Sequence, residues 1–170
     1  MKDKKRRVIA VSGTPGTGKT TVSKILARKY KLKYLDVKSM IKKYDLSEEF
    51  DKERDCEVID VKKLVLFLIG KISEFKELKK TKFQGMIIDS HLSHNIAPHM
   101  VDLCIITKCS LPVLKKRLEK RGYSETKVRE NLDAEIFDTC KVEAMEKGHK
   151  IKVLWTDKEE HESLRDIISD

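Results

Sequence analysis

Five short apolar runs, separated by longer stretches of mixed residues, dominate the hydrophobic pattern of the chain. Such runs are typical of strands in a parallel sheet that is covered by helices on both faces. They predict strands at residues 7–12, 33–35, 85–89, 103–107 and 151–154. Because amphipathic stretches separate the runs, the sequence predicts an α/β fold, a three-layer sandwich with a five-stranded parallel sheet.

Between the strands, apolar residues recur at the spacing of one helix face. The pattern predicts helices at residues 19–30, 60–75, 110–122, 124–148 and 160–168. Asp60 and Ser110 are expected N-caps, and Gly122 and Gly148 are expected helix ends. Residues 46–56 are polar, acidic and irregular, so we interpret them as a mobile binding segment.

The segment between the first strand and the first helix reads Gly-Thr-Pro-Gly-Thr-Gly-Lys-Thr, from Gly13 to Thr20. This is a complete G-x-x-x-x-G-K-[ST] phosphate-binding loop, and it is not the G-x-G-x-x-G pattern of dinucleotide dehydrogenases. Glycines let the chain turn tightly and aim backbone N–H groups at phosphate, with the N-terminus of the following helix behind them. Lys19 supplies a cation for the β- and γ-phosphates, and the Thr20 hydroxyl is a ligand for Mg²⁺.

Asp89 ends a second apolar strand, as does the acid that holds Mg²⁺ through water in phosphate-loop enzymes. The alternative is an aspartate that caps a turn or helix. His91 follows closely, and it could position water or an acceptor group near the γ-phosphate, or gate the acid. A metal site of Asp89, His91 and His94 is a further alternative, but Mg²⁺ already accounts for the acid. His94 and His99 are expected to be loop or packing residues.

Arg117 and Arg121 are four residues apart on one predicted helix face. Guanidinium groups bind phosphates with two hydrogen bonds and stack on adenine, and phosphoryl transfer needs positive charge near the transferred group. Both arginines could equally belong to a solvated charged face, because lysines and a glutamate surround them. The candidate residues for nucleotide binding are therefore Gly13, Pro15, Gly16, Thr17, Gly18, Lys19, Thr20, Thr21 and Arg117; those for catalysis are Lys19, Asp89, His91 and Arg121; those for Mg²⁺ are Thr20 and Asp89.

Net charge and cysteine content restrict the possible functions less than the motifs do. The 170 residues suffice for one domain, and the net charge of +9 favours phosphate-rich partners such as RNA. A charged fraction of 38% equally suits the surface ion pairs of a heat-adapted protein.

The four cysteines contain no C-x-x-C pair, so a zinc site is disfavoured and free, mostly buried thiols are expected. Cys104 and Cys109 flank a predicted strand and are expected to be packing residues. No apolar stretch reaches the roughly 18 residues of a membrane span, and the charged start is unlike a secretory signal, so we expect a cytosolic or nuclear protein.

Several motifs converge on one family. The phosphate loop, the triplet Asp89-Ser90-His91 and the run from Arg117 to Tyr123 together resemble adenylate kinase isoenzyme six, the family of coilin-interacting nuclear ATPases. Residues 53–56, 130–131 and 135–137 match as well, so the resemblance covers roughly residues 8–168 and suits an archaeal-type member. The phosphate loop is shared by many families, whereas the other motifs are much more specific.

The resemblance implies an adenylate-kinase-like domain over residues 1–170, with a nucleoside monophosphate-binding insertion at about 37–75 and a short lid at about 121–131. Such proteins phosphorylate AMP from Mg²⁺-bound ATP and also hydrolyse ATP. They act in maturation of the small ribosomal subunit, on pre-ribosomal particles, by binding a platform ribosomal protein. By position, Arg117 would stack on adenine, Arg121 would contact the phosphates, Asp89 and His91 would serve ATP turnover, and residues 156–158 would border adenine.

Two features depart from the family pattern. Lys42, in the segment 38–43 on the monophosphate side, stands where an arginine contacting AMP is expected, and lysine lacks the planar two-pronged contact. Ser90 replaces a glycine or a bulkier residue. The stretch between Tyr123 and Asn131 is too short for a large lid, so water exclusion is expected to be poor, which suits ATP hydrolysis beside transfer.

Three functions fit these motifs. The first is an adenylate kinase, a monomer that acts on ATP and AMP. The second is an ATP-driven assembly factor whose kinase activity is incidental and whose positive charge serves docking near ribosomal RNA. The third is a kinase for another small metabolite, for which no acceptor motif is visible.

Overall fold

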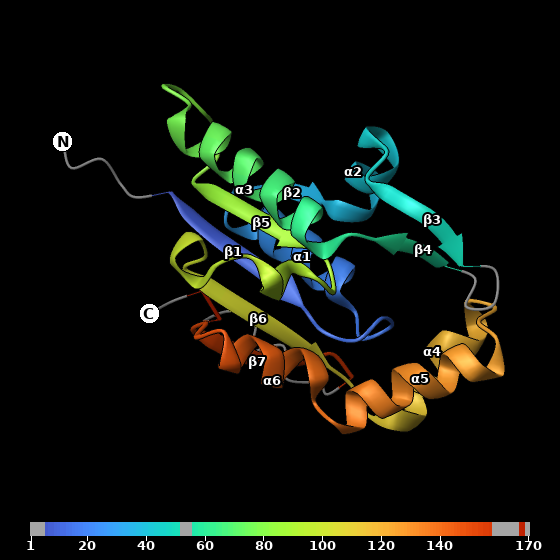
Figure 1. The fold of residues 1–170 in the computed structure, drawn as a ribbon. Helices are drawn as coiled ribbons and strands as arrows, with labels where there is room; N and C mark the ends of the chain where they lie inside the picture. The colour runs from blue at the N-terminus through green and yellow to red at the C-terminus, as the bar shows by residue number, and fades with distance from the viewer. Residues whose placement is uncertain (1–5, 52–55, 158–166, 169–170) are drawn as a thin grey trace.

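The computed structural model describes residues 6–51, 56–157 and 167–168 of the chain. Its centre is a parallel sheet in the order β2-β5-β1-β6-β7 (Figure 1). The strands are β1 (Arg7–Ser12), β2 (Leu32–Asp36), β5 (Gly85–Asp89), β6 (Leu103–Lys108) and β7 (Ile151–Trp155). The predicted five-stranded parallel sheet is confirmed, with small differences at the strand ends.

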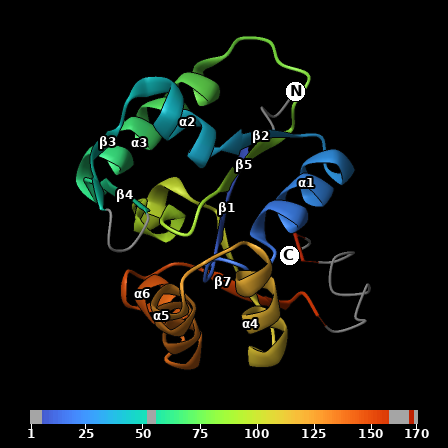
Figure 2. The same ribbon diagram turned by 90° about the vertical axis from the view of Figure 1, so that its right-hand side faces the viewer.

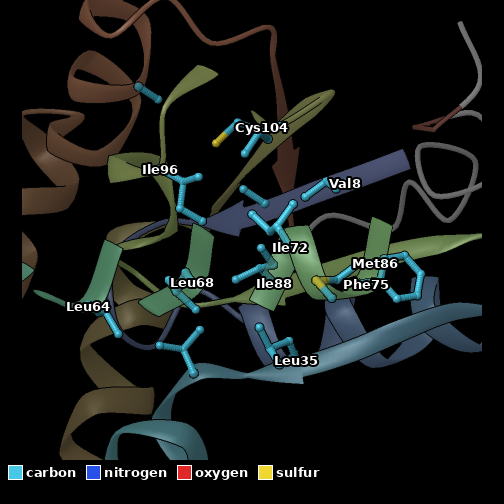
Figure 3. Close-up of a cluster of buried hydrophobic side chains, with 14 of the residues drawn as sticks. Val8, Leu35, Leu64, Leu68, Ile72, Phe75, Met86, Ile88, Ile96 and Cys104 are labelled. Carbon is cyan, nitrogen blue, oxygen red and sulfur yellow. The ribbon is translucent and has the colours of Figure 1, made fainter. Parts of the chain in front are cut away.

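Helices cover both faces of this sheet. On one face, α1 (Lys19–Lys29) packs through Val22 and Leu26 on Ile9, Val11 and Ile87. On the other, α3 (Val61–Glu77) packs through a stripe of fully buried side chains, with Ala144 of α6 (Thr139–Glu146) in the same cluster. Figure 3 shows that cluster, in which α3 and the sheet interdigitate. Successive strand residues point to opposite faces, which explains why these strands are apolar throughout.

Two further groups of elements stand at the carboxyl edge of the sheet, which faces the viewer in Figure 2. One consists of α2 (Val37–Tyr44) and the antiparallel strands β3 (Ser47–Asp51) and β4 (Cys56–Ile59). The other consists of α4 (Leu111–Lys120) and α5 (Glu125–Ile136). The short 3₁₀ turns η1 (Ser93–Asn95) and η2 (Pro98–Met100) follow β5. In both views the two groups lie on opposite sides of this edge.

Three local predictions are wrong. Within residues 46–56, the described part forms β3 and the start of β4 rather than an irregular segment, because the two strands pair with each other. The single helix expected over residues 124–148 is two helices, α5 and α6, since Asp138 takes a left-handed φ of 54° between them. Ser110 precedes α4 but makes no side-chain cap; its backbone N–H instead donates to Asp157 Oδ2 at 2.8 Å.

Other local predictions are confirmed. Asp60 caps α3 by accepting hydrogen bonds from the N–H groups of Lys62 and Lys63. Gly122 follows α4 with a positive φ of 73°. Cys104 and Cys109 are buried thiols of the core. The helix predicted at 160–168 falls mainly outside the described residues, and no helix among those described is long and apolar enough to span a bilayer.

Candidate nucleotide-binding site

The phosphate loop lies between β1 and α1 and depends on its glycines. Gly13, Gly16 and Gly18 have φ values of 136°, 96° and 94°, which residues with a Cβ rarely adopt. A Cβ at Gly13 would lie 2.4 Å from the Thr107 carbonyl oxygen, and one at Gly16 would lie 2.8 Å from Leu114 Cδ1. The loop is therefore packed tightly against β6 on one side and α4 on the other.

Buried hydroxyl groups fix the inside of the loop. Thr17 Oγ1 donates to the Thr14 carbonyl oxygen at 2.8 Å and lies 2.7 Å from Thr107 Oγ1. Thr107 Oγ1 in turn donates to the Ser12 carbonyl oxygen at 3.2 Å. Thr107, on the neighbouring strand β6, was not foreseen from the sequence. These bonds connect the loop to itself and to β6, and they limit the shapes that it can adopt.

Lys19 stretches across the mouth of the loop. Its Nζ donates to the carbonyl oxygens of Gly13 at 2.7 Å and Thr14 at 2.9 Å. Burial lowers the pKa of Lys19 to about 8, against the opposing effect of nearby Cys140 and Asp89. A polyanion would supply the negative charge that the buried ammonium lacks.

Asp89 ends β5 next to the first turn of α1. It is buried, and its Oδ2 accepts a hydrogen bond from Tyr34 Oη at 2.8 Å. Burial and then this bond raise the pKa of Tyr34. Tyr34, a residue of β2 that was not singled out from the sequence, thus holds the carboxylate of Asp89, one of the two candidate Mg²⁺ ligands. Hydroxyl and carboxylate oxygens are the ligands that Mg²⁺ prefers, so this arrangement fits the ion.

The histidines after β5 separate into different environments. Desolvation of the His91 ring, followed by the charges of Lys19 and His94, lowers its pKa to about 4. His94 is buried, with Nδ1 2.7 Å from Ser12 Oγ and Nε2 2.6 Å from Glu143 Oε2. His94 is therefore a packing residue of the loop base, as predicted. Across the described residues, no three His, Cys, Asp or Glu side chains gather in a way that could hold a metal ion.

The two arginines of α4 differ in their surroundings. Arg117 Nη1 donates to the Gly16 carbonyl oxygen at 3.3 Å and to Thr156 Oγ1 at 3.1 Å. Thr156 Oγ1 donates to the Thr17 carbonyl oxygen at 2.7 Å, so the turn after β7 and α4 meet behind the loop. Arg121 is exposed at the end of α4, yet near enough for its charge to depress the pKa of Lys19.

The remaining candidates also gather at the carboxyl edge. Pro15 and Gly18 are half-buried in the loop, whereas the hydroxyl residues Thr20 and Thr21 are exposed in the first turn of α1. Lys42 is exposed on α2, whose N-cap Asp36 accepts from the Ser39 N–H. Glu135 of α5 reaches the loop from the opposite side, where its Oε2 accepts from Thr14 Oγ1 at 2.6 Å. Because Glu135 is 121 residues from Thr14 in the sequence, no local sequence pattern predicts this contact.

Comparisons with known proteins identify the family of the chain. Residues 9–138 match the family described as "AAA domain". A Methanocaldococcus jannaschii protein named "Putative adenylate kinase" is 43% identical over 143 residues, which cover 84% of this chain and 75% of that protein. A Methanosarcina mazei protein of the same name is 39% identical over 169 residues, which cover 94% and 84%. The Caenorhabditis elegans "Adenylate kinase isoenzyme 6 homolog" is 31% identical over 143 residues, covering 84% and 75%.

Solved structures support the fold. A sugar kinase from a Janibacter species superposes with a TM-score of 0.59 at 16% identity, covering 96% of this chain and 92% of that one. Shikimate kinase from Bacteroides thetaiotaomicron gives a TM-score of 0.55 at 14% identity, covering 94% and 92%. At these identities the likeness concerns the fold alone, that of phosphate-loop kinases. By its sequence relatives, this chain belongs to the AAA-domain family and to the family that contains the archaeal putative adenylate kinases and the isoenzyme 6 homologue.

Proposed function

We propose that the protein is an adenylate kinase that transfers the γ-phosphate of ATP to AMP and yields two ADP. The observation that carries this proposal is the closed, hydrogen-bonded phosphate loop with Lys19 across its mouth and Asp89 beside it. The names of the relatives, "Putative adenylate kinase" and "Adenylate kinase isoenzyme 6 homolog", support AMP as the acceptor.

In this proposal the chain contributes positioning and charge rather than a covalent intermediate. The loop N–H groups and Lys19 bind the β- and γ-phosphates, and Arg117 lies where it can flank the adenine beside Thr156. Thr20 and Asp89 would hold Mg²⁺, which when bound neutralises charge on the phosphate oxygens. Arg121, exposed on the short connection between α4 and α5, turns toward the transferred group. His91, neutral because its pKa is low, orients the acceptor or a water molecule.

The acceptor is proposed to lie between the phosphate loop and the group of α2, β3 and β4, within the insertion at about residues 37–75. Lys38 and Lys42 are exposed on α2 and can attract a monophosphate. Because lysine is a point charge, we expect AMP to bind through Lys42 less tightly than through an arginine.

A second activity, ATP hydrolysis, is favoured by the lid. Helix α4 ends at Lys120 and α5 begins at Glu125. The lid proposed at about 121–131 therefore contains only a short loop that could cover the phosphates. Water then competes with AMP for the γ-phosphate. We propose that this hydrolysis serves maturation of the small ribosomal subunit in the cytoplasm, through binding of a platform ribosomal protein by a monomer. The net charge of +9 suits docking near ribosomal RNA.

Product analysis with a panel of acceptors tests the proposal. The protein is given MgATP alone, or with AMP, CMP, dUMP or shikimate, and separately with a purified platform ribosomal protein. We expect two ADP per ATP consumed with AMP, and slower release of free phosphate without it. Phosphorylation of another acceptor in preference to AMP, or one ADP and one free phosphate per ATP in every mixture, would contradict the kinase assignment.

The Lys19→Ala variant provides the control, because every activity of the site should disappear with it. Phosphate release that rises with the ribosomal protein while AMP is inert would favour the assembly-factor alternative. Nucleotide-dependent co-sedimentation with small-subunit precursors is the corresponding test for that role; its absence would contradict it.

A further inference from the structure

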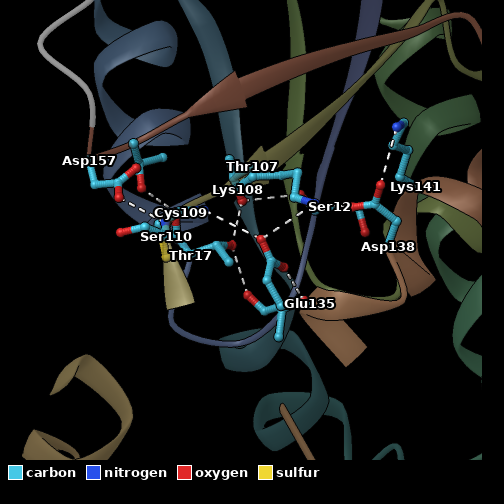
Figure 4. Close-up of polar contacts among 12 residues, drawn as sticks. Ser12, Thr17, Thr107, Lys108, Cys109, Ser110, Glu135, Asp138, Lys141 and Asp157 are labelled. Atoms are coloured by element: carbon cyan, nitrogen blue, oxygen red, sulfur yellow. Dashed lines mark hydrogen bonds and ion pairs between the residues drawn. The ribbon is translucent and has the colours of Figure 1, made fainter. Parts of the chain in front are cut away.

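A buried carboxylate connects the phosphate loop to the helix that follows the lid region. Glu135 lies in the last turn of α5 and is only 6% exposed. Its Oε2 accepts the hydrogen bond from Thr14 Oγ1 at 2.6 Å, and its Oε1 accepts from the Cys109 N–H at 3.4 Å (Figure 4). Lys108 Nζ lies 3.9 Å from the same Oε1. Burying a carboxylate is costly, so a residue of this kind needs such partners.

Thr14, the residue that Glu135 holds, makes several of the hydrogen bonds within the phosphate loop. Its carbonyl oxygen accepts three hydrogen bonds, from the Thr17 N–H at 3.2 Å, from Thr17 Oγ1 at 2.8 Å and from Lys19 Nζ at 2.9 Å. The orientation of Thr14 therefore sets where the Lys19 ammonium lies. Holding Thr14 in place therefore holds one of the two carbonyl oxygens that bind the Lys19 ammonium.

The other end of this connection is anchored in the sheet. Lys108, at the end of β6, forms an ion pair with Asp138 at the junction of α5 and α6. Asp138 also accepts from Lys141 Nζ at 3.2 Å. These contacts hold the last turn of α5 against the sheet (Figure 4), while the first turns of α5 pack on α4 through Val128. Glu135 thus lies between the part of α5 that packs on α4 and the end of α5 that is held against the sheet.

We propose that Glu135 is a positioning residue that holds Thr14, and through Thr14 the phosphate loop and Lys19, in the form that binds the triphosphate. The same contact makes α5 respond to nucleotide, because the loop and the end of the helix share one carboxylate. This inference rests on the proposed ATP site, but it does not depend on which acceptor receives the phosphate.

A double-mutant cycle between Thr14 and Glu135 tests the connection. Thr14→Val and Glu135→Met, which keeps the length of the side chain but has no acceptor oxygen, are each titrated with MgATP in a calorimeter well below the melting temperature. Each single change should weaken ATP binding about tenfold, because a buried hydrogen bond to a charged group is lost. The double variant should bind no worse than the weaker single variant, since both remove the same contact. Thr14→Ser, which keeps the hydroxyl, should bind ATP nearly as the parent does.

Hydrogen exchange separates positioning from a general loss of packing. In the parent, MgATP should slow amide exchange in residues 125–136, and Thr14→Val should lose that protection even at saturating ATP. Asp133→Asn, an exposed acid on the same helix, is the matched control and should change neither readout. Strictly additive losses, or ATP affinities within twofold of the parent in both single variants, would overturn the proposal.

The kinase assignment and the Thr14–Glu135 connection can be contradicted independently of each other. A parent protein that binds MgATP but phosphorylates no AMP would contradict the kinase assignment and leave the cycle valid. A folded parent that binds no MgATP would overturn both.

Discussion

The two sides of the carboxyl edge are built in different ways. On the phosphate side, Thr14 and Thr17 are buried, and their hydrogen bonds close on β6 and α5. On the acceptor side, Lys38 and Lys42 are exposed on α2. Charges in water are screened and contribute little individually, whereas buried bonds leave costly unpaired groups when broken. Changes on the phosphate side should therefore cost far more activity than changes on α2.

After Lys19→Ala, the largest effect is expected from Asp89→Asn. The amide keeps the size of the side chain but removes the charge that would bind Mg²⁺, so AMP phosphorylation should fall about 100- to 1,000-fold. Initial rates at saturating ATP and Mg²⁺ measure this. Asp133→Asn removes an acid elsewhere and should leave the rate unchanged; a rate within threefold of the parent for Asp89→Asn would exclude the acid from the reaction.

A pH titration should weaken ATP binding by up to tenfold per pH unit above about pH 8. The pKa of Lys19 in the free protein is about 8, below its ordinary value of 10.5, and the triphosphate should raise it again. Above pH 8 the free protein has lost a proton that the complex retains, so affinity decreases and binding takes up a proton. Calorimetry at pH 7, 8 and 9 in two buffers of different ionisation heat detects both effects. Equal affinities at pH 7 and 9 would show that Lys19 does not titrate in this window.

Tyr34→Phe should raise the Mg²⁺ concentration needed for half-maximal rate by about five- to tenfold. The change removes only the hydroxyl that donates to Asp89 and keeps the ring in the α1 face of the core. Rates across a Mg²⁺ series, and Mn²⁺ binding in the presence of ATP, report it. Tyr30→Phe, at the far end of α1, is the matched control. Identical Mg²⁺ curves for Tyr34→Phe and the parent would remove Tyr34 from the ion site.

The smallest effect is expected on the acceptor side. Lys42→Arg should lower the KM for AMP about two- to fivefold with kcat nearly constant, because guanidinium can bind a phosphate with two hydrogen bonds. Lys116→Arg on α4 makes the same exchange away from the proposed acceptor site. A larger effect than that of Asp89→Asn would reverse the contrast between the two sides.

The sequence predicted the sheet and the phosphate loop because both depend on neighbouring residues. Apolar strands and the spacing of Gly13, Gly16 and Gly18 are local features, and the structure gives these glycines the positive φ values that the turn requires. The N-cap Asp60 was foreseen for the same reason. The cap Asp36 offered a similar signal for α2, which was not read as a helix.

Contacts between segments that are distant in the sequence could not be predicted from local patterns. Tyr34, Thr107 and Glu135 lie on three different elements, and only the fold brings them to the loop. The break between α5 and α6 was missed because Asp138, a non-glycine residue, adopts the left-handed conformation beside Lys108. The β3–β4 hairpin was missed since its polar sequence lacks the apolar alternation of a buried strand.

The fate of a labelled γ-phosphate shows whether this loop transfers phosphate to a nucleotide. The protein is mixed with MgATP labelled in its γ-phosphate and with AMP, and the products are separated at early times. The label should appear first as the β-phosphate of ADP made from AMP, at a rate that saturates with AMP and vanishes in Lys19→Ala. Label found solely in free phosphate, at the same rate with and without AMP, would contradict transfer from this loop to a nucleotide.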